Sequence, residues 1–458
     1  MDFLMTQVAI IHDPSRFRVG TLIYSRAGLV TLFAWLLWGD FVYTLMESVM
    51  PSLLPLVLRD NGASNQAIAF IVSSIYMMVN AVANPIISYK SDRFRSRWGR
   101  RRPFILVTTP FVVILLALIP FAPEISRMMG GIGWFAGLLK YSPVTSLVLI
   151  SGALVGAFQV FNMFVSSVYY YLIADVVPEA FIGRFYALFR VFGALAGLLF
   201  SYFILGMAKT YMHEIFTGMA IFYGLFITLM CLRVKEGEYP PPDQREERGH
   251  WWSGIRNYAK ECFGHPFYIL VFLVYGLNIW AGASNVFVIF FSRDQLGLTL
   301  DQIGKMGAYI GLFSMIIIYP LGILLDRWGS HKSMIASLFA AAVLRLVSFY
   351  LTHDYWSLLL WSILCSVPIS MTGLAIAKWL IDLYPRERYG QFGSAGAMVS
   401  SIGAALIGPL CGLFFDYVKD YRYVFLWPAP FYLAGALSAW FVYRKWKAMG
   451  GESGYLAP

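Results

Sequence analysis

Apolar runs of about 20 residues recur along the whole chain, and they limit its fold more than any other feature. The chain has 458 residues, of which 59% are hydrophobic and only 13% are charged. A soluble domain of this length has no interior large enough to bury so much apolar surface. The runs are long and continuous, whereas the strands of a membrane barrel are short and alternate in polarity. The sequence therefore predicts an all-α integral membrane protein.

The apolar runs divide into twelve predicted spans. These are 29–57, 66–89, 103–122, 144–173, 185–206, 214–232, 266–291, 302–325, 333–351, 356–381, 392–415 and 424–443. The first run is too long for a cleaved leader, so we expect it to be a membrane span. The predicted organisation is a tail at 1–28, a six-helix bundle at 29–232, a central loop at 233–265, a second six-helix bundle at 266–443 and a tail at 444–458.

The most highly charged segment, 90–102, carries seven Lys or Arg residues and one Asp between two apolar runs. Lipid excludes such a segment, so it must face water. Placing it in the cytoplasm puts most of the 35 Lys and Arg residues on that side of the membrane, which is the usual positive-inside distribution. We therefore expect both tails and the central loop to be cytoplasmic. The net charge of +10 then reflects topology and does not indicate nucleic-acid binding.

The remaining sequence features argue against catalysis and against a bound cofactor. The four cysteines are scattered, without metal or redox spacing, and are expected to pack between helices. There is no nucleophile triad, metal cluster or phosphate-binding loop, so we predict no enzyme activity and no metal site. The segment 123–143 between two spans is either a short amphipathic helix on the membrane surface or a plain loop.

Two loop motifs occur at equivalent places in the two halves of the chain. After the second span of each half, Asp92-Arg93 corresponds to Asp326-Arg327. After the fourth span of each half, Asp175-x-x-Pro178 corresponds to Asp382-x-x-Pro385. Such a repeat indicates two bundles related by an axis along the membrane normal, which is the arrangement of the major facilitator fold.

The repeated loops suit a gate that opens and closes at the cytoplasmic end. Arginine binds carboxylates and helix ends in a forked geometry, so these pairs could hold one state and break in the other. The predicted gate residues are Asp92, Arg93, Arg100, Arg101, Arg102, Asp175, Arg184, Asp326, Arg327 and Asp382. The alternative is that the arginines only anchor the loops to anionic headgroups. Lys378 and Asp382 lie one turn apart, and we expect them to form a local ion pair.

The sequence around the basic segment resembles a known family. Asn80-x-x-x-Asn84-Pro85, followed by the run D-R-F-R-S-R-W-G-R-R-R-P-F from Asp92 to Phe104, resembles the glycoside–pentoside–hexuronide:cation symporters. Their pattern there is D-x-x-x-D-P followed by D-R-T-x-S-R-W-G-R-x-R-P. The run from Ser91 to Ile105 is also similar to the proton-coupled sucrose transporters. The resemblance covers the twelve-span layout, although its specific motifs lie mainly in the first half. It implies the major facilitator fold and symport of a sugar or glycoside.

The same resemblance implies a sugar-binding site. Asp40 resembles the sugar-binding Asp of the melibiose permease type in the first span, and Arg190 resembles its sugar-binding Arg in the fifth span. Charged hydrogen bonds to hydroxyl groups are strong and directional. Four further residues are candidates to line the cavity: Gln159, Asn162, Asn278 and Trp280. The alternative is that the amides bond neighbouring helices and that the indole faces lipid.

The coupling ion is less well indicated than the substrate. The family's paired carboxylates in the second span are Asn80 and Asn84 here, so the affinity for Na⁺ should fall sharply. Asp40 and Glu47 are seven residues apart and share a helix face. A charge near the middle of the bilayer costs roughly 3 kcal/mol or more, and burial favours the protonated carboxyl. Either residue could therefore carry a proton.

Taken together, these features predict a secondary active transporter of a sugar or glycoside that works by alternating access, with H⁺ as the coupling ion. We expect a monomer in the plasma membrane, and specifically a bacterial inner membrane. Two alternatives keep the same fold: a carrier of a lysolipid or other amphiphile, and a sugar carrier that is sodium-coupled or uncoupled. A receptor or an intramembrane enzyme is disfavoured because the central loop is too short for a signalling domain.

Overall fold

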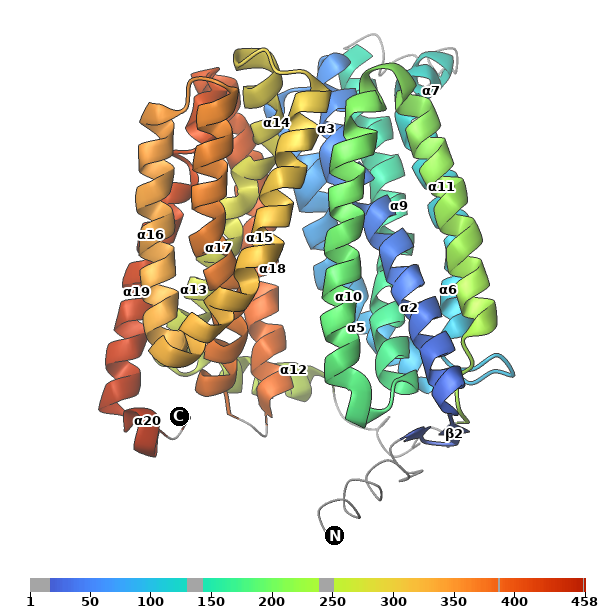
Figure 1. Ribbon diagram of the computed structural model, residues 1–458, viewed down its shortest axis with the longest axis vertical. Coiled ribbons are helices and arrows are strands. Elements are labelled where there is room, and N and C mark those ends of the chain that lie inside the picture. Colours follow the sequence, from blue (N-terminus) through green and yellow to red (C-terminus); the bar gives the residue numbers. More distant parts are fainter. Residues whose placement is uncertain (1–16, 130–142, 239–250, 386–387, 456) are drawn as a thin grey trace, which may run out of the picture.

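The computed structural model describes residues 17–129, 143–238, 251–385, 388–455 and 457–458, and it consists of two helical bundles side by side (Figure 1). The first bundle contains α2 (Arg26–Glu47), α3 (Val49–Asp60), α4 (Asn65–Ala69), the π-helical turn η2 (Phe70–Ser74), α5 (Ile75–Arg93), α6 (Arg102–Leu118), the 3₁₀ turn η3 (Ile119–Phe121), α7 (Ala122–Met129), α9 (Pro143–Val176), α10 (Glu179–Leu199), the π-helical turn η4 (Phe200–Ile204), the 3₁₀ turn η5 (Leu205–Met207) and α11 (Ala208–Arg233).

The second bundle follows a connecting helix, α12 (Trp251–Phe263). It contains α13 (Pro266–Ala281), the 3₁₀ turn η7 (Gly282–Phe287), α14 (Val288–Phe290), the π-helical turn η8 (Phe291–Gln295), α15 (Leu300–Trp328), α16 (Ser330–Leu351), α17 (Tyr355–Leu383), α18 (Tyr389–Val418), the 3₁₀ turn η10 (Tyr421–Val424), α19 (Pro428–Ala448) and α20 (Gly451–Gly454). A short antiparallel hairpin of β1 (Arg18–Val19) and β2 (Leu22–Ile23) precedes α2, with Arg18 opposite Ile23.

The number of membrane crossings agrees with the sequence. Within the described ranges, eleven uninterrupted helical segments are long and apolar enough to cross a membrane. One of them, Glu179–Arg233, has 55 residues, about twice the length that a single crossing requires. Its backbone leaves helical geometry at Tyr211, where two antiparallel helices meet, so it supplies two crossings. The expected all-α fold with twelve spans is therefore confirmed. No polar loop separates α10 from α11 because η5 continues the hydrogen-bonded turns between them.

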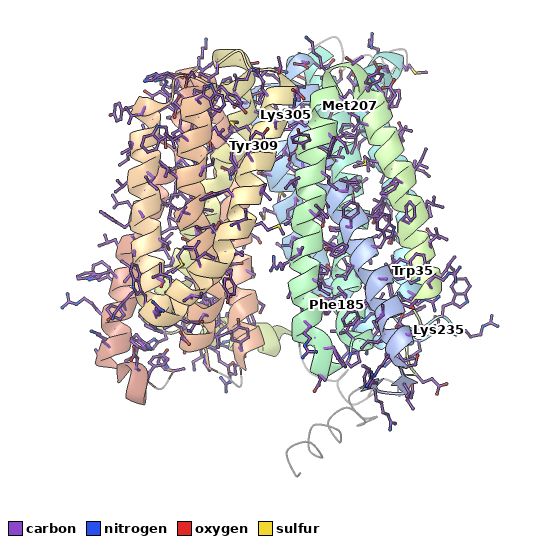
Figure 2. All side chains as sticks on the ribbon, in the orientation of Figure 1. Trp35, Phe185, Met207, Lys235, Lys305 and Tyr309 are labelled. Carbon is purple, nitrogen blue, oxygen red and sulfur yellow. The ribbon has the colours of Figure 1, made fainter. Side chains whose placement is uncertain are left out.

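The molecule has two distinct ends. The hairpin and α20 lie at the same end, at the bottom of Figure 1. Segment 90–102 joins α5 to α6 at this end, which we call the basic end. Lys235 projects there, whereas Met207 and Lys305 lie at the opposite end, which we call the far end (Figure 2). The assignment of the basic end to the cytoplasm remains a prediction from the distribution of Lys and Arg.

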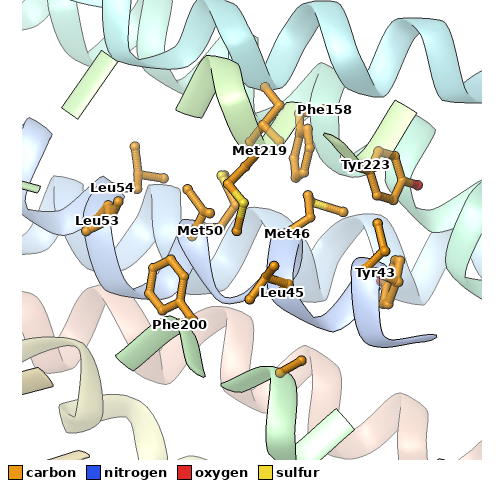
Figure 3. Close-up of a cluster of buried hydrophobic side chains, with 14 of the residues drawn as sticks. Tyr43, Leu45, Met46, Met50, Leu53, Leu54, Phe158, Phe200, Met219 and Tyr223 are labelled. Atoms are coloured by element: carbon orange, nitrogen blue, oxygen red, sulfur yellow. The ribbon is translucent and has the colours of Figure 1, made fainter. Parts of the chain in front are cut away.

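Apolar side chains fill the bundles and also cover their outer surfaces. One large buried cluster belongs mainly to the first bundle, and Figure 3 shows Met46, Met50, Phe158 and Phe200 within it. A second buried cluster lies within the second bundle. Many large apolar side chains remain exposed on the outside, including Tyr319 at 76%. A soluble monomer rarely exposes such a surface, and a lipid bilayer would cover it.

The two bundles are joined mainly towards the far end. There α18 packs against α4, η2 and α5, and α15 packs against η4, η5 and α10. At the basic end, every ion pair recorded within the described ranges joins residues of the same bundle or joins the second bundle to α12. The structure is therefore that of a state sealed at the far end.

Two connections differ from a plain loop. Residues 251–263 of the predicted central loop form α12, which is bonded to the start of α18 because Tyr258 Oη lies 2.8 Å from Ser394 Oγ and Gln391 Nε2 donates to Glu261 at 2.8 Å. In segment 123–143, the helix α7 extends to Met129, which favours the helical alternative. Residues 130–142 and the triple proline at 240–242 lie outside the described residues.

Candidate functional site

A polar cavity opens in the first bundle, between α2, α5 and α9. We call it the Asn84 cavity; its volume is about 330 Å³. Its wall contains ten side chains: Tyr43, Glu47, Tyr76, Asn80, Asn84, Met163, Ser166, Ser167, Tyr170 and Tyr171. Asn84 Oδ1 accepts hydrogen bonds from Ser167 Oγ at 2.9 Å and from Tyr171 Oη at 3.3 Å. The two asparagines that replace the family's carboxylates therefore face the same cavity, and Asn84 is held in place by α9.

A second cavity of about 270 Å³ adjoins the first, and we call it the Gln159 cavity. Glu47 and Tyr76 line both cavities. Gln159 is 7% exposed and Asn162 is 3% exposed, and each has a buried side-chain oxygen without a hydrogen-bond partner. Burying an unpaired polar group is unfavourable. These two amides therefore have unused hydrogen-bonding capacity beside the cavity that they line.

Glu47 is the carboxylate that both cavities share. It ends α2, and Tyr43, one turn earlier, donates a hydrogen bond to its Oε1 at 3.2 Å. The lining of the Gln159 cavity also includes an apolar wall of Met50, Val72 and Phe158. A sugar needs this combination, because its hydroxyl groups seek polar partners while its carbon faces pack against apolar side chains.

Asp40 occupies a different position from Glu47. It is 2% exposed and is not among the residues that line either cavity. Its Oδ2 has no hydrogen-bond partner and faces α10, where a Cβ added to Gly193 would lie 3.3 Å away. Arg190, one turn earlier on α10, is close enough to interact electrostatically with Asp40. No ion pair between them is formed within the described residues, and Arg190 is exposed.

The candidates of the second bundle lie away from the two cavities. Asn278 and Trp280 are half-buried on α13 and line neither cavity. Trp280 Nε1 donates to the carbonyl oxygen of Ser400 at 2.9 Å. The indole packs so closely on α18 that a Cβ atom added at Gly403 would lie 2.1 Å from it. The indole is thus held against α18. The structure brings together Glu47, Asn80, Asn84, Gln159 and Asn162, whereas the other candidates do not line the two cavities.

Several cavity residues were missed by sequence reasoning. Tyr43 and Tyr76 each lie one turn before a predicted residue, Glu47 and Asn80 respectively, so they share a helix face with it. That spacing is the signal that could have identified them. Among the three consecutive tyrosines, Tyr170 and Tyr171 line the Asn84 cavity, whereas Tyr169 is buried and donates to the carbonyl oxygen of Leu36.

At the basic end, five of the predicted gate residues of the first bundle (Asp92, Arg100, Arg101, Arg102 and Asp175) form one compact cluster. Asp175 accepts from Arg100 Nε at 2.9 Å and from Arg101 Nε at 3.0 Å, and Arg101 also pairs with Asp92. Glu236, which follows α11, accepts from the backbone N–H groups of Arg100, Arg101 and Arg102 at 2.9, 3.1 and 2.7 Å. Arg102 Nε donates to the carbonyl oxygen of Cys231 at 2.5 Å. We call this set the Glu236 clasp.

The remaining predicted gate residues of the first bundle are Arg184 and Arg93. The Arg184 guanidinium lies 6.0 Å from the ring centroid of Phe181. Arg93 ends α5 next to Asp92.

The equivalent loops of the second bundle pair differently from the prediction. Lys378 bonds Asp326 at 3.3 Å, and both side chains are exposed. Asp382 instead accepts from Ser330 Oγ at 2.5 Å. The expected local pair of Lys378 and Asp382 is therefore wrong, because α16 begins directly after Gly329 and presents Ser330 to the end of α17. Arg327 lies in the last turn of α15.

The comparisons with known proteins agree with this architecture. The sequence model of a family described as "MFS/sugar transport protein" matches residues 35–425. Rice (Oryza sativa subsp. indica) "Sucrose transport protein SUT5" is 45% identical over 49 residues, which is 11% of this chain and 9% of that protein. This match thus spans about a tenth of the relative's length.

Solved structures share the fold at low sequence identity. A variant of the nucleoside transporter NupG superposes with a TM-score of 0.70 at 13% identity, covering 90% of this chain and 100% of the other. A D-xylose-proton symporter superposes with a TM-score of 0.61 at 15% identity, covering 91% and 98%. These matches are all to transporters, in agreement with the absence of a catalytic constellation in the sequence, and they confirm the predicted fold.

Proposed function

The chain belongs to the MFS/sugar transport protein family, and we propose that it moves a sugar or glycoside across the membrane by alternating access. The observation that carries this proposal is the pair of adjoining cavities in the first bundle. They combine a carboxylate, four amides and several tyrosines with an apolar wall. The far end is sealed in this state, so a ligand would reach the cavities from the basic end.

Within this proposal, Gln159 and Asn162 bind sugar hydroxyl groups through their unpaired amide atoms. An amide can both donate and accept, as a hydroxyl group does. Asn278 and Trp280 of the second bundle, together with Arg190, remain predicted contacts of the ligand. The rice relative is a sucrose transport protein, and one structural neighbour is a D-xylose-proton symporter. Both support a sugar as the cargo.

We further propose that H⁺ is the coupling ion and that Glu47 carries it. Glu47 faces both cavities, so a proton and a sugar can influence each other there. Asp40 is the second candidate for carrying the proton, although it lines neither cavity. Asn80 and Asn84 supply amide oxygens without negative charge, which disfavours Na⁺ at this place.

The substrate is tested by counterflow in proteoliposomes loaded with unlabelled sugar and exposed to a panel of radiolabelled monosaccharides, disaccharides and glycosides. We expect at least one sugar to accumulate transiently, and Asn162→Ala to reduce that accumulation. Asn61→Ala serves as a control, since Asn61 lies at the far end and bonds the Val57 carbonyl. Absence of counterflow for every member of the panel would contradict the proposal.

The apolar wall of the Gln159 cavity also favours a second candidate, the transport of a lysolipid or another amphiphile. A thermal-shift measurement separates the two functions. Stabilisation by a lysolipid and by none of the sugars would favour the amphiphile. We propose a monomer in the plasma membrane, as in a bacterial inner membrane, for either cargo.

A further inference from the structure

At the far end, a carboxylate of one bundle binds the first turn of a helix in the other bundle. Asp416, near the end of α18, accepts from the backbone N–H of Asn65 through Oδ1 at 2.9 Å and from that of Gln66 through Oδ2 at 2.9 Å. The helix that begins at Asn65 continues through η2 and α5 as a span of 29 residues. The first N–H groups of a helix lack partners inside it, and the helix dipole favours a negative charge beside them.

The face of α18 that leads to Asp416 consists of glycines. Gly408, Gly412 and Asp416 are spaced four residues apart, so they lie along one side of the helix. A Cβ at Gly412 would lie 2.4 Å from the carbonyl oxygen of Asn65, and one at Gly408 would lie 2.9 Å from Ser74 Oγ. Only glycine permits this approach at Gly412, and the approach is what places the carboxylate of Asp416 on α4.

The contact is buried on the side of Asn65 and exposed on the side of Gln66. Tyr421 Oη donates to Asn65 Oδ1 at 2.7 Å, and these residues are 6% and 4% exposed respectively. The Arg59 guanidinium of the first bundle lies 5.6 Å from the ring centroid of Tyr421. Hydrogen bonds to a charged group are stronger than those between neutral groups. The contact therefore adds more than close packing to the seal.

In the related contact between α15 and the end of α10, no carboxylate binds backbone N–H groups of the other bundle within the described residues. The start of α15 is capped by its own Thr299 and Gln302. Close approach is still present there, since a Cβ at Gly304 would lie 2.2 Å from the carbonyl oxygen of Ser201. Of these two junctions, only the one between α18 and α4 has, within the described residues, a carboxylate that binds the start of a helix in the other bundle.

We propose that Asp416 is a positioning residue of the transport cycle, which stabilises the state sealed at the far end and must release α4 before that end opens. The contact suits a reversible seal, because water can replace both hydrogen bonds when the bundles separate. This inference rests on the proposed alternating access of the two ends. It does not depend on which molecule is carried.

The protein contains a natural reporter for the test. Cys411 is 0% exposed and belongs to the same buried cluster as Leu53 and Ala63 of the first bundle. A chain in which Cys231, Cys262 and Cys365 are replaced by serine retains Cys411 as its single thiol. The rate of its reaction with a maleimide in detergent then measures the opening of the far end. A second reporter, Ser166→Cys combined with Cys411→Ser, measures access to the Asn84 cavity.

We expect Asp416→Asn to increase the labelling rate of Cys411 by roughly tenfold, since hydrogen bonds to a charged group are replaced by weaker ones. The same change should slow labelling of the thiol introduced by Ser166→Cys, because the two ends open alternately. Glu124→Gln is the control at the same end; its pair with Arg127 lies within α7 and is exposed, so its loss should have little effect.

Faster labelling of both reporters would indicate general loosening and would overturn the proposal, as would an unchanged rate at Cys411. A second variant gives an independent test if Asp416→Asn does not fold. Gly412→Ala should produce the same reciprocal change, whereas Gly311→Ala, with open space around the added methyl group, should not. Equal behaviour of these two glycine variants would also overturn it. The labelling needs no substrate, so its failure is distinguishable from the failure of the proposed function.

Discussion

At the scale of single residues, the depth of a side chain decides which candidates can meet a ligand. Asp40 and Glu47 share a face of α2, as their spacing predicts, yet Glu47 alone lines the two cavities. The spacing of residues in the sequence predicts which helix face they share, but it does not predict which neighbouring helix packs against each turn. Asp40 meets α10 at Gly193, and this contact between distant segments has no local signal in the sequence.

The amides of the Gln159 cavity give the first prediction. Gln159→Ala and Asn162→Ala each remove hydrogen bonds worth about 1 kcal/mol, so we expect the KM for the transported sugar to rise about fivefold in each. The maximum rate should change less than KM. Initial-rate uptake over a range of sugar concentrations measures both quantities. Unchanged KM in both variants would show that these amides do not bind the sugar.

The asparagines of α5 give the second prediction. The double change Asn80→Asp and Asn84→Asp restores the carboxylate pattern that the family resemblance implies for cation binding. We expect sugar uptake by this variant to respond to an imposed Na⁺ gradient, because carboxylates bind a cation better than neutral amides do. The unchanged chain should not respond. Equal stimulation of both proteins by Na⁺ would contradict proton coupling.

At the scale of elements, apolar runs were enough to predict the spans, since lipid requires long helices. The join between α10 and α11 and the helix α12 were not predictable in the same way. η5 and the first turns of α11 are helical where a loop was expected at 207–213, and α12 is ordered by Tyr258 and Glu261 against the start of α18. Both features depend on contacts and on turn geometry that hydropathy does not report.

The Glu236 clasp gives the third prediction. Glu236→Ala removes the acceptor for three backbone N–H groups, and charged hydrogen bonds contribute about 1.5–3 kcal/mol each. We expect a fall in Tm of several degrees in a thermal-shift assay. Asp326→Asn is the control from the second bundle, because its exposed pair with Lys378 should contribute little. Equal Tm values for the two variants would contradict the stabilising role of the clasp.

At the scale of the whole molecule, the repeated loop motifs predicted two related bundles, and the structure has them. What the repeat did not predict is that the two copies differ. The first copy is a dense cluster around Asp175, whereas the second separates Lys378 from Asp382. The motif spacing is the same in both halves. Asp175 binds arginine side chains, whereas the corresponding Asp382 binds the hydroxyl group of Ser330. Partners therefore follow from side-chain identity as well as from position.

The orientation of the molecule gives the fourth prediction. The distribution of Lys and Arg places the basic end in the cytoplasm. In a bacterial host, we expect green fluorescent protein fused after Pro458 to fluoresce and alkaline phosphatase at the same position to be inactive. Fusions after Met129, at the far end, should give the reverse pattern. Active phosphatase after Pro458 would contradict this topology.

Proton-driven sugar transport through the first-bundle cavities is tested most directly by uptake of the sugar into proteoliposomes with an imposed pH gradient. We predict that the gradient accelerates uptake by the unchanged chain and that Glu47→Gln abolishes this acceleration while sugar exchange continues. Glu214→Gln, an exposed acid on α11, should behave like the unchanged chain. Equal uptake with and without the gradient would contradict proton coupling, and a full response in Glu47→Gln would remove Glu47 from the proton's path.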